Sequence, residues 1–121
     1  MARTADERRE ALRLGALAEL RVGDALEAQG WRVLARNWRF EGGELDLVVA
    51  RDGALRVVEV KARAPDDPVG LDAIDAHKRR CLARTAEAFL AGYDDVVDEV
   101  CFLVALVEGD RITWLDDAFD A

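Results

Sequence analysis

Two acids and a lysine occupy strand-like segments in which apolar residues predominate. Asp46 lies within residues 44–50, and Glu59 and Lys61 lie within residues 54–63. Side chains alternate between the two faces of a strand, so we expect Glu59 and Lys61 on one face. If the two segments pair as a hairpin, Asp46 converges with them on the same side of the sheet. The spacing therefore predicts two carboxylates and one ammonium group in one place.

This combination suits metal-assisted hydrolysis of a phosphodiester. Mg²⁺ prefers oxygen ligands and usually takes one or two protein carboxylates together with waters and substrate phosphates. The ion polarises the phosphate and acidifies a bound water, while a lysine beside it can position or deprotonate that water. A second interpretation fits the same spacing, because the solvent-facing side of an ordinary sheet alternates in the same way. Periodicity alone favours this second interpretation.

The surrounding segments predict the sheet that positions these residues. Asp52-Gly53 favours a tight turn, so residues 44–50 and 54–63 should form an antiparallel hairpin. Alternation predicts one face with Glu44, Asp46 and Val48 and an opposite face with Leu45, Leu47 and Val49.

Two helices and three further strands complete the pattern. One helix is expected over residues 8–30, ending at Gly30, and a second from an N-cap at Asp75 to about Leu90. The second helix should turn the stripe Leu82, Ala86, Phe89 toward the core. Strands are expected over residues 31–40, 100–107 and 112–115, with the apolar run 100–107 buried on both faces. The order α-β-β-β-α-β-β predicts an α/β (α+β) fold, a central mixed sheet flanked by helices.

The same segments resemble a known nuclease superfamily. Asp46 followed by Glu59-Val60-Lys61 resembles the signature of the PD-(D/E)xK nucleases. Its setting is more specific. Gly-Gly-Glu-Leu-Asp-Leu-Val at 42–48 and Val-Glu-Val-Lys-Ala-Arg at 58–63 resemble the characteristic block of the YraN-like family, small bacterial proteins similar to archaeal Holliday-junction resolvases.

The resemblance extends over most of the chain, although the carboxy-terminal part matches only loosely. The matching positions are Gly15 and Glu19 in the first helix, Gly30-Trp31 at its end, Arg36-Asn37-Trp38-Arg39 in the next strand, and the segment 73–82 with Lys78 in the second helix. Ala18 departs from the family, which more often has glycine before the glutamate. That departure bears on helix packing and not on the chemistry.

The family resemblance implies a restriction-endonuclease-like fold and a metal-dependent endonuclease that acts on DNA, branched or damaged. It implies that Asp46, Glu59 and Glu19 hold Mg²⁺, or Mn²⁺ in its place, and that Lys61 serves the nucleophile. The likeness to resolvases makes a homodimer reasonable. The alternative is a catalytically silent DNA-binding or protein-interaction module that retains the nuclease fold.

Glu19 can also be judged from the residues around it. It shares a helical stripe with Leu12, Gly15, Val22 and Leu26. An acid on an apolar face needs a partner, because its desolvation is otherwise costly. The helix could instead be turned to bury Leu14, Leu17 and Leu20 and expose Glu19; on the first orientation those leucines could mark a dimer contact.

Six basic residues flank the expected site and are candidates for binding phosphate: Arg36, Arg39, Arg63, Lys78, Arg79 and Arg84. Each by itself is more typical of a solvated surface charge. Glu44 fits two interpretations, an acid that supports the site and a surface residue at the end of a strand. His77 is the only histidine and is interpreted as a surface residue, and Trp31, Trp38 and Trp114 as packing residues.

Composition sets the remaining expectations. The 121 residues fit a single nuclease-like domain over 1–121, with residues 1–7 flexible and residues 64–70 in a loop. Apolar runs are too short to cross a bilayer, and the amino terminus lacks an export signal, so we expect a cytoplasmic protein. The net charge of −8 argues against a nucleic-acid partner. Residues 85–121, however, carry one basic and ten acidic residues, so the acidic excess is concentrated there.

Overall fold

The computed structural model describes residues 4–62 and 76–116 of the chain. Its elements are α1 (Ala5–Ala28), β1 (Arg32–Phe40), β2 (Gly43–Arg51), β3 (Ala54–Ala62), α2 (Ala76–Ala91), β4 (Glu99–Glu108) and β5 (Arg111–Asp116). The predicted α+β class and the order of elements are confirmed. Arg63, the expected loop 64–70 and the expected N-cap Asp75 lie outside the described residues.

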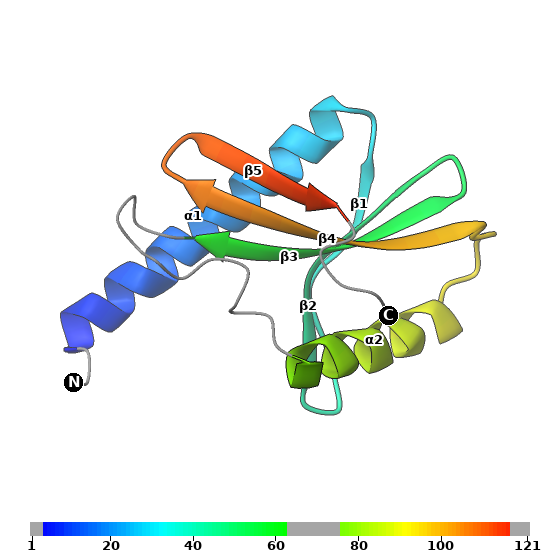
Figure 1. Ribbon diagram of the computed structural model, residues 1–121, viewed down its shortest axis with the longest axis horizontal. Coiled ribbons are helices and arrows are strands. Elements are labelled where there is room, and N and C mark those ends of the chain that lie inside the picture. The colour runs from blue at the N-terminus through cyan, green and yellow to red at the C-terminus, as the bar shows by residue number, and fades with distance from the viewer. Residues whose placement is uncertain (1–3, 63–75, 117–121) are drawn as a thin grey trace.

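The five strands form one mixed sheet in the order β1-β2-β3-β4-β5. The β3 and β4 strands are parallel, and every other neighbouring pair is antiparallel. A parallel pair needs a long crossover connection, and the segment that contains α2 provides it. The two helices cover opposite faces of the sheet (Figure 1). As predicted, β4 is an inner strand, and its residues from Phe102 to Ala105 are buried.

Each helix builds its own core layer against the sheet. On one face Ala18, Val22 and Leu26 of α1 pack with sheet residues that include Leu47 and Val58. On the other face the predicted stripe of α2, Leu82, Ala86 and Phe89, packs with sheet residues that include Val48 and Val57. The sheet is therefore apolar on both faces over most of its area, so a charged side chain inside it requires an explanation.

Two tight turns set the register of the first three strands. Asp52 and Gly53 have φ of 48° and 82°, the left-handed pair that a two-residue hairpin turn requires, as predicted. Glu41 and Gly42, with φ of 45° and 80°, join β1 to β2 in the same way. The sequence did not predict this second turn, because glutamate is an unusual residue at its first position.

The first helix differs from the expectation at both ends. It begins at Ala5, not at residue 8, because Thr4 and Glu7 form a capping box in which Thr4 Oγ1 accepts the Glu7 N–H at 3.1 Å. Residues 4–7 thus form the cap and first turn where a flexible segment was expected. The helix ends at Ala28, and Gly30 follows with φ of 93°.

The orientation of α1 directs Glu19 toward the sheet. Leu14, Leu17 and Leu20 are 47%, 38% and 52% exposed, whereas Ala18, Val22 and Leu26 are buried. Leu12, which was expected in the core stripe, is 75% exposed. The reason is that the amino-terminal turns of α1 extend beyond the edge of the strands and have no sheet beneath them (Figure 1). Neither helix in the described part of the chain is long and apolar enough to span a membrane.

Candidate active site

The β2 and β3 strands separate at the acidic residues. Their pairing runs from Arg51 and Ala54 to Leu47 and Val58 and stops before Asp46. At the next step the Val60 backbone N–H donates to Asp46 Oδ2 at 2.9 Å. A side-chain carboxylate therefore takes the place of a ladder hydrogen bond, which fixes Asp46 at the fork. Beyond this point β2 turns away from β3 toward the start of α2 (Figure 1).

The fork overturns one predicted feature of the strand. Leu45 was expected to share a face with Leu47 and Val49, but it packs with Val48 in the core layer of α2. Strict alternation fails because β2 leaves the ladder between these residues. Opposite this point in β1, Asn37 has φ of 49°, a left-handed conformation that asparagine tolerates better than most residues.

Asp46 and Glu59 line one cavity of about 210 Å³. Its other walls are the β1–β2 turn, Gly42 to Glu44, and the first turns of α2, at Lys78, Cys81 and Leu82. The structure thus brings together the two carboxylates that the sequence placed on one face. It adds a wall from α2 that the strand pattern did not indicate.

Two lysines contact Glu59, whose residue is only 5% exposed. Lys78 Nζ lies 2.7 Å from Glu59 Oε1, and Lys61 Nζ lies 3.5 Å from the same oxygen. A buried carboxylate is tolerated when cations and hydrogen bonds compensate its desolvation. Lys78 had been expected only as a phosphate-binding residue, and nothing in the local sequence indicates its contact with Glu59.

The charges in the cavity shift one another's protonation. Burial, and then the charge of Glu59, raise the pKa of Asp46 to about 7. Burial, and then Lys78, lower the pKa of Lys61. Burial also acts to lower the pKa of Lys78, but the hydrogen bond and charge of Glu59 outweigh it and raise the pKa. The site therefore holds a carboxyl whose pKa is about 7 and, near it, an amine whose pKa is lowered.

Glu19 of α1 lies near this cavity but does not line it. Its residue is half-buried, and burial raises the pKa of its carboxyl, while a hydrogen bond with Asn37 acts in the opposite direction. The charges of Glu44 and Glu59 also raise that pKa. Asn37 is thus a hydrogen-bond partner of Glu19, the acid on the apolar stripe of α1. The sequence signal for this contact was an asparagine within an otherwise strand-like segment.

The carboxylates fit a hard divalent cation only in part. Within residues 4–62 and 76–116, no group of three or more His, Cys, Asp or Glu side chains is placed to hold a metal ion. The structure does not gather Glu19, Asp46 and Glu59 into one three-acid centre. Asp46 and Glu59 on one cavity nevertheless match the one or two carboxylates that Mg²⁺ usually takes from a protein.

The predicted phosphate-binding residues fall into separate groups. Arg36 lies on the α1 side, with its guanidinium against Gly23 and Nη2 3.8 Å from Glu27 Oε1. Arg39 lies at the end of β1, with Nε 3.8 Å from Glu44 Oε2. The α2 residues Lys78, Arg79 and Arg84 form the third group, in which Lys78 lines the cavity and Arg84 lines a separate hollow.

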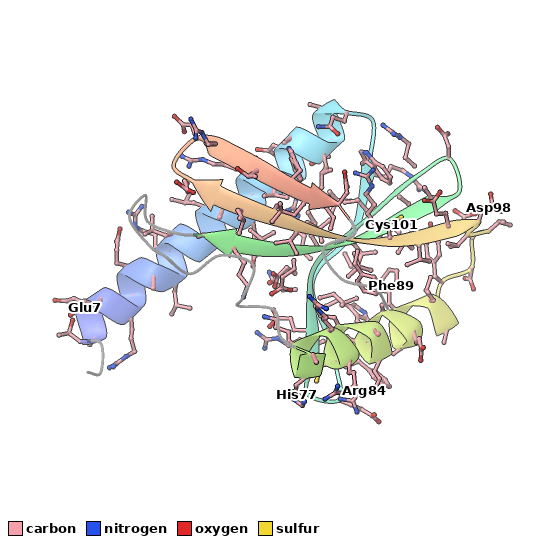
Figure 2. All side chains as sticks on the ribbon, viewed as in Figure 1. Glu7, His77, Arg84, Phe89, Asp98 and Cys101 are labelled. Carbon is pink, nitrogen blue, oxygen red and sulfur yellow. The ribbon has the colours of Figure 1, made fainter. Side chains whose placement is uncertain are left out.

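A basic hollow on the outer side of α2 extends this last group. His77, Arg80, Ala83 and Arg84 line a space of about 450 Å³. Figure 2 shows His77 and Arg84 on the side of α2 turned away from the sheet, opposite Phe89. His77 is a surface residue, as expected. Arg80 was not among the predicted phosphate-binding residues, although positions 77, 80 and 84 have the spacing of residues on one face of a helix.

Comparison with known proteins assigns the chain to a family. The model of UPF0102, described as an uncharacterised protein family, matches residues 18–110. The chain belongs to the UPF0102 family. This is the YraN-like group, so the family resemblance seen in the sequence is confirmed.

Curated UPF0102 proteins from several bacteria are similar over most of their length. One from Gloeobacter violaceus is 50% identical over 96 residues, which cover 77% of this chain and 76% of the relative. One from Synechococcus sp. strain JA-3-3Ab is 46% identical over 98 residues, covering 78% and 75%. One from Paracidovorax citrulli is 43% identical over 113 residues, covering 88% and 82%. The matches span the fork and both walls of its cavity.

Proposed function

We propose that this UPF0102 chain is a metal-dependent, endonuclease-like phosphodiester hydrolase that acts on DNA, branched or damaged. The observation that carries the proposal is the fork between β2 and β3, where Asp46 and Glu59 face one cavity beside Lys61. The resemblance to the PD-(D/E)xK nucleases and their restriction-endonuclease-like fold supports it. The names of the related UPF0102 proteins give no activity.

Each side chain has a distinct role in this proposal. Asp46 and Glu59 would hold Mg²⁺ or Mn²⁺, and Glu19 of α1 would add a third carboxylate near the ion. When bound, the ion supplies the charge that polarises the scissile phosphate and acidifies the attacking water. Lys61, whose pKa is lowered, would orient that water and, in its neutral amine form, accept its proton. Lys78, Arg79 and Arg84 would hold phosphates of the DNA, and Arg36, Arg39 and Arg63 are further candidates for phosphate binding.

The test is cleavage of single-stranded, linear duplex and four-way-junction DNA in Mg²⁺ or Mn²⁺. Wild type should cut at least one substrate, and Asp46→Asn and Lys61→Ala should each lose at least about a hundredfold in rate. Glu87→Gln is a matched control, because Glu87 is an exposed acid on α2 away from the cavity. Activity that survives both site substitutions identifies a contaminant or a different site and refutes the assignment.

A catalytically silent DNA-binding or protein-interaction module is the second candidate. It is favoured by the net charge of −8 and by Lys78, whose ammonium contacts the carboxylate that a metal would need. Wild type that binds DNA in both Mg²⁺ and Mn²⁺ without cutting it would establish this alternative.

A homodimer through α1 is the proposed assembly. Leu14, Leu17 and Leu20 are exposed on a helix that extends past the sheet, and exposed apolar patches mark interaction sites. Sedimentation should give a dimer for the wild type and a monomer for Leu17→Glu. Val96→Glu, at a 78% exposed residue outside α1, should leave the dimer intact. A monomeric wild type refutes the assembly.

A further inference from the structure

Phe40 is an exposed aromatic residue at the end of β1, beside the β1–β2 turn. Its residue is 47% exposed, and in the part of the chain described it is the one aromatic residue among the large exposed apolar ones. A single exposed apolar residue needs no explanation by itself. Phe40 differs from an ordinary surface residue in two ways: other aromatic rings pack against it, and it lies next to the carboxylate cavity.

The ring of Phe40 is held in place by other aromatic rings. Trp38 stacks beside it, with ring centroids 6.0 Å apart and planes 7° from parallel. Trp38 in turn meets Phe89 of α2 edge-on at 5.3 Å, and Phe89 stacks with Tyr93 at 5.8 Å. This series connects Phe40 to the core layer of α2. A ring that is already ordered loses little conformational entropy when a flat ligand stacks on it.

Phe40 also adjoins the carboxylate cavity. It lines a hollow of about 260 Å³ together with Arg39 and the residues from Glu41 to Glu44. Three of these residues, Gly42, Gly43 and Glu44, line the cavity of Asp46 and Glu59 as well. Gly42 has no side chain, and a Cβ placed there would meet nothing within 4 Å. The rim between the ring and the acids is therefore low and open.

Charge divides this rim into two parts. Glu41 and Glu44 stand beside Phe40, and Arg39 is engaged by Glu44 at 3.8 Å, so the hairpin tip disfavours a phosphate. On the other wall of the cavity, Lys78 of α2 supplies a positive charge. A nucleotide crossing the cavity would thus place its phosphate toward α2 and its base toward the hairpin.

We propose that Phe40 stacks on an unpaired nucleobase next to the phosphodiester held in the cavity, so that the preferred substrate contains a single-stranded or unpaired segment. The inference rests on the proposed function and adds the class of DNA. In an intact duplex the base faces stack on one another and a side chain reaches them only by unstacking them. An unpaired base offers its face directly, and stacking on an aromatic side chain contributes about 1–3 kcal/mol per base.

Equilibrium binding without turnover tests the inference. Fluorescein-labelled single-stranded DNA and blunt duplex of the same sequence are titrated with protein in EDTA. Phe40→Ala should weaken single-strand binding about tenfold and leave duplex binding unchanged, while Phe40→Trp should retain single-strand binding. Val96→Ala, at an exposed apolar residue that lines neither the cavity nor the hollow, should change neither. A 2-aminopurine base in the strand should lose its quenching in Phe40→Ala.

Three results would overturn the inference. Phe40→Ala could lose affinity equally for single-stranded and duplex DNA, it could lose affinity for neither, or the wild type could fail to bind single strands. Conversion of a dimer to a monomer by Phe40→Ala in sedimentation would show that a second copy, not a base, covers the ring. The cleavage assay is separate. Wild type that cuts DNA while Phe40→Ala binds normally refutes the stacking role alone, whereas stacking without cleavage refutes the nuclease alone.

Discussion

At the residue scale, burial of like charges dominates the site. The desolvated Asp46 carboxyl lies near Glu59, and its hydrogen bond from Val60 offsets only part of the cost. Alternation predicted that Glu59 and Lys61 share a face and that Asp46 converges with them, but it did not distinguish a site from an ordinary solvent-facing side of a sheet. The resemblance to the PD-(D/E)xK nucleases singled these residues out. The contact of Lys78 with Glu59 could not be predicted, because it depends on how α2 packs across the sheet.

Asp46 gives a prediction about stability and pH in the metal-free protein. Its pKa is raised from 3.8 to about 7, so folding favours the protonated form, and the stability it contributes is lost as pH rises through 7. Asp46→Asn cannot ionise and keeps an oxygen for the Val60 N–H. As pH rises from about 4 to about 8, the free energy of unfolding of the variant should therefore increase by about 2 kcal/mol relative to that of wild type. This is less than the full pKa shift of Asp46 implies, because the site is partly open to water.

Urea unfolding in EDTA at both pH values measures this difference. Asp110→Asn is the control, since Asp110 is fully exposed and should give the same pH dependence as wild type. A constant difference between Asp46→Asn and wild type across this range would contradict the raised pKa.

Lys78 gives a prediction about metal affinity. Its ammonium lies 2.7 Å from Glu59 Oε1 and competes with any cation for that oxygen. Lys78→Met should therefore bind Mn²⁺ several-fold more tightly in calorimetry, even though it should bind DNA less tightly. Arg79→Met, one residue along α2 and outside the cavity lining, should leave Mn²⁺ affinity unchanged. Weaker Mn²⁺ binding by Lys78→Met would mean that the lysine holds Glu59 in position for the ion.

At the element scale, the sequence predicted what depends on local pattern. The order of elements, the Asp52-Gly53 turn and the buried face of α2 all follow from periodicity and turn chemistry. The placement of Leu45 does not, because β2 leaves its partner strand in mid-course. The exposure of Leu12 likewise depends on where the sheet ends beneath α1.

The contact between the β1–β2 hairpin and α2 gives a prediction at this scale. A Cβ on Gly43 would lie 2.0 Å from Thr85 Oγ1, and Thr85 is buried and donates to the Cys81 carbonyl at 2.8 Å. Gly43→Ala should therefore destabilise the fold by about 2 kcal/mol through overpacking. Thr85→Ala removes the colliding oxygen, so the double variant should be more stable than the sum of the two single changes predicts.

Thermal and urea unfolding of the four proteins in this cycle measure the coupling. Gly15→Ala serves as the control, since a Cβ there meets nothing within 4 Å and helix propensity should make the change neutral or stabilising. Strict additivity of Gly43→Ala and Thr85→Ala would show that the hairpin shifts away from α2 at little cost.

At the scale of the whole molecule, an acidic protein must bind a polyanion through a small basic region. The net charge is −8, and residues 85–121 supply much of the acidic excess. Among the described basic residues of α2, Lys78 lines the cavity and Arg80 and Arg84 line the separate hollow, so the described structure offers few phosphate contacts. The sequence indicated the segregation of charge along the chain. It could not show that Arg36 would be drawn to α1 and away from this group.

The salt dependence of DNA binding follows from that arrangement. For single strands the slope of log K against log salt is about −0.7 for each phosphate neutralised, so a slope between about −2 and −3 is expected. Arg79→Gln with Arg84→Gln should reduce its magnitude by about 1.4, because two contacts are lost. Arg111→Gln removes one positive charge, as each α2 substitution does, but on β5, at the opposite edge of the sheet from the strands β1 and β2 that α2 contacts. It should lower affinity slightly without changing the slope. If Arg111→Gln instead reduces the slope as much as each α2 substitution does, binding responds to overall charge and the path of the DNA along α2 is wrong.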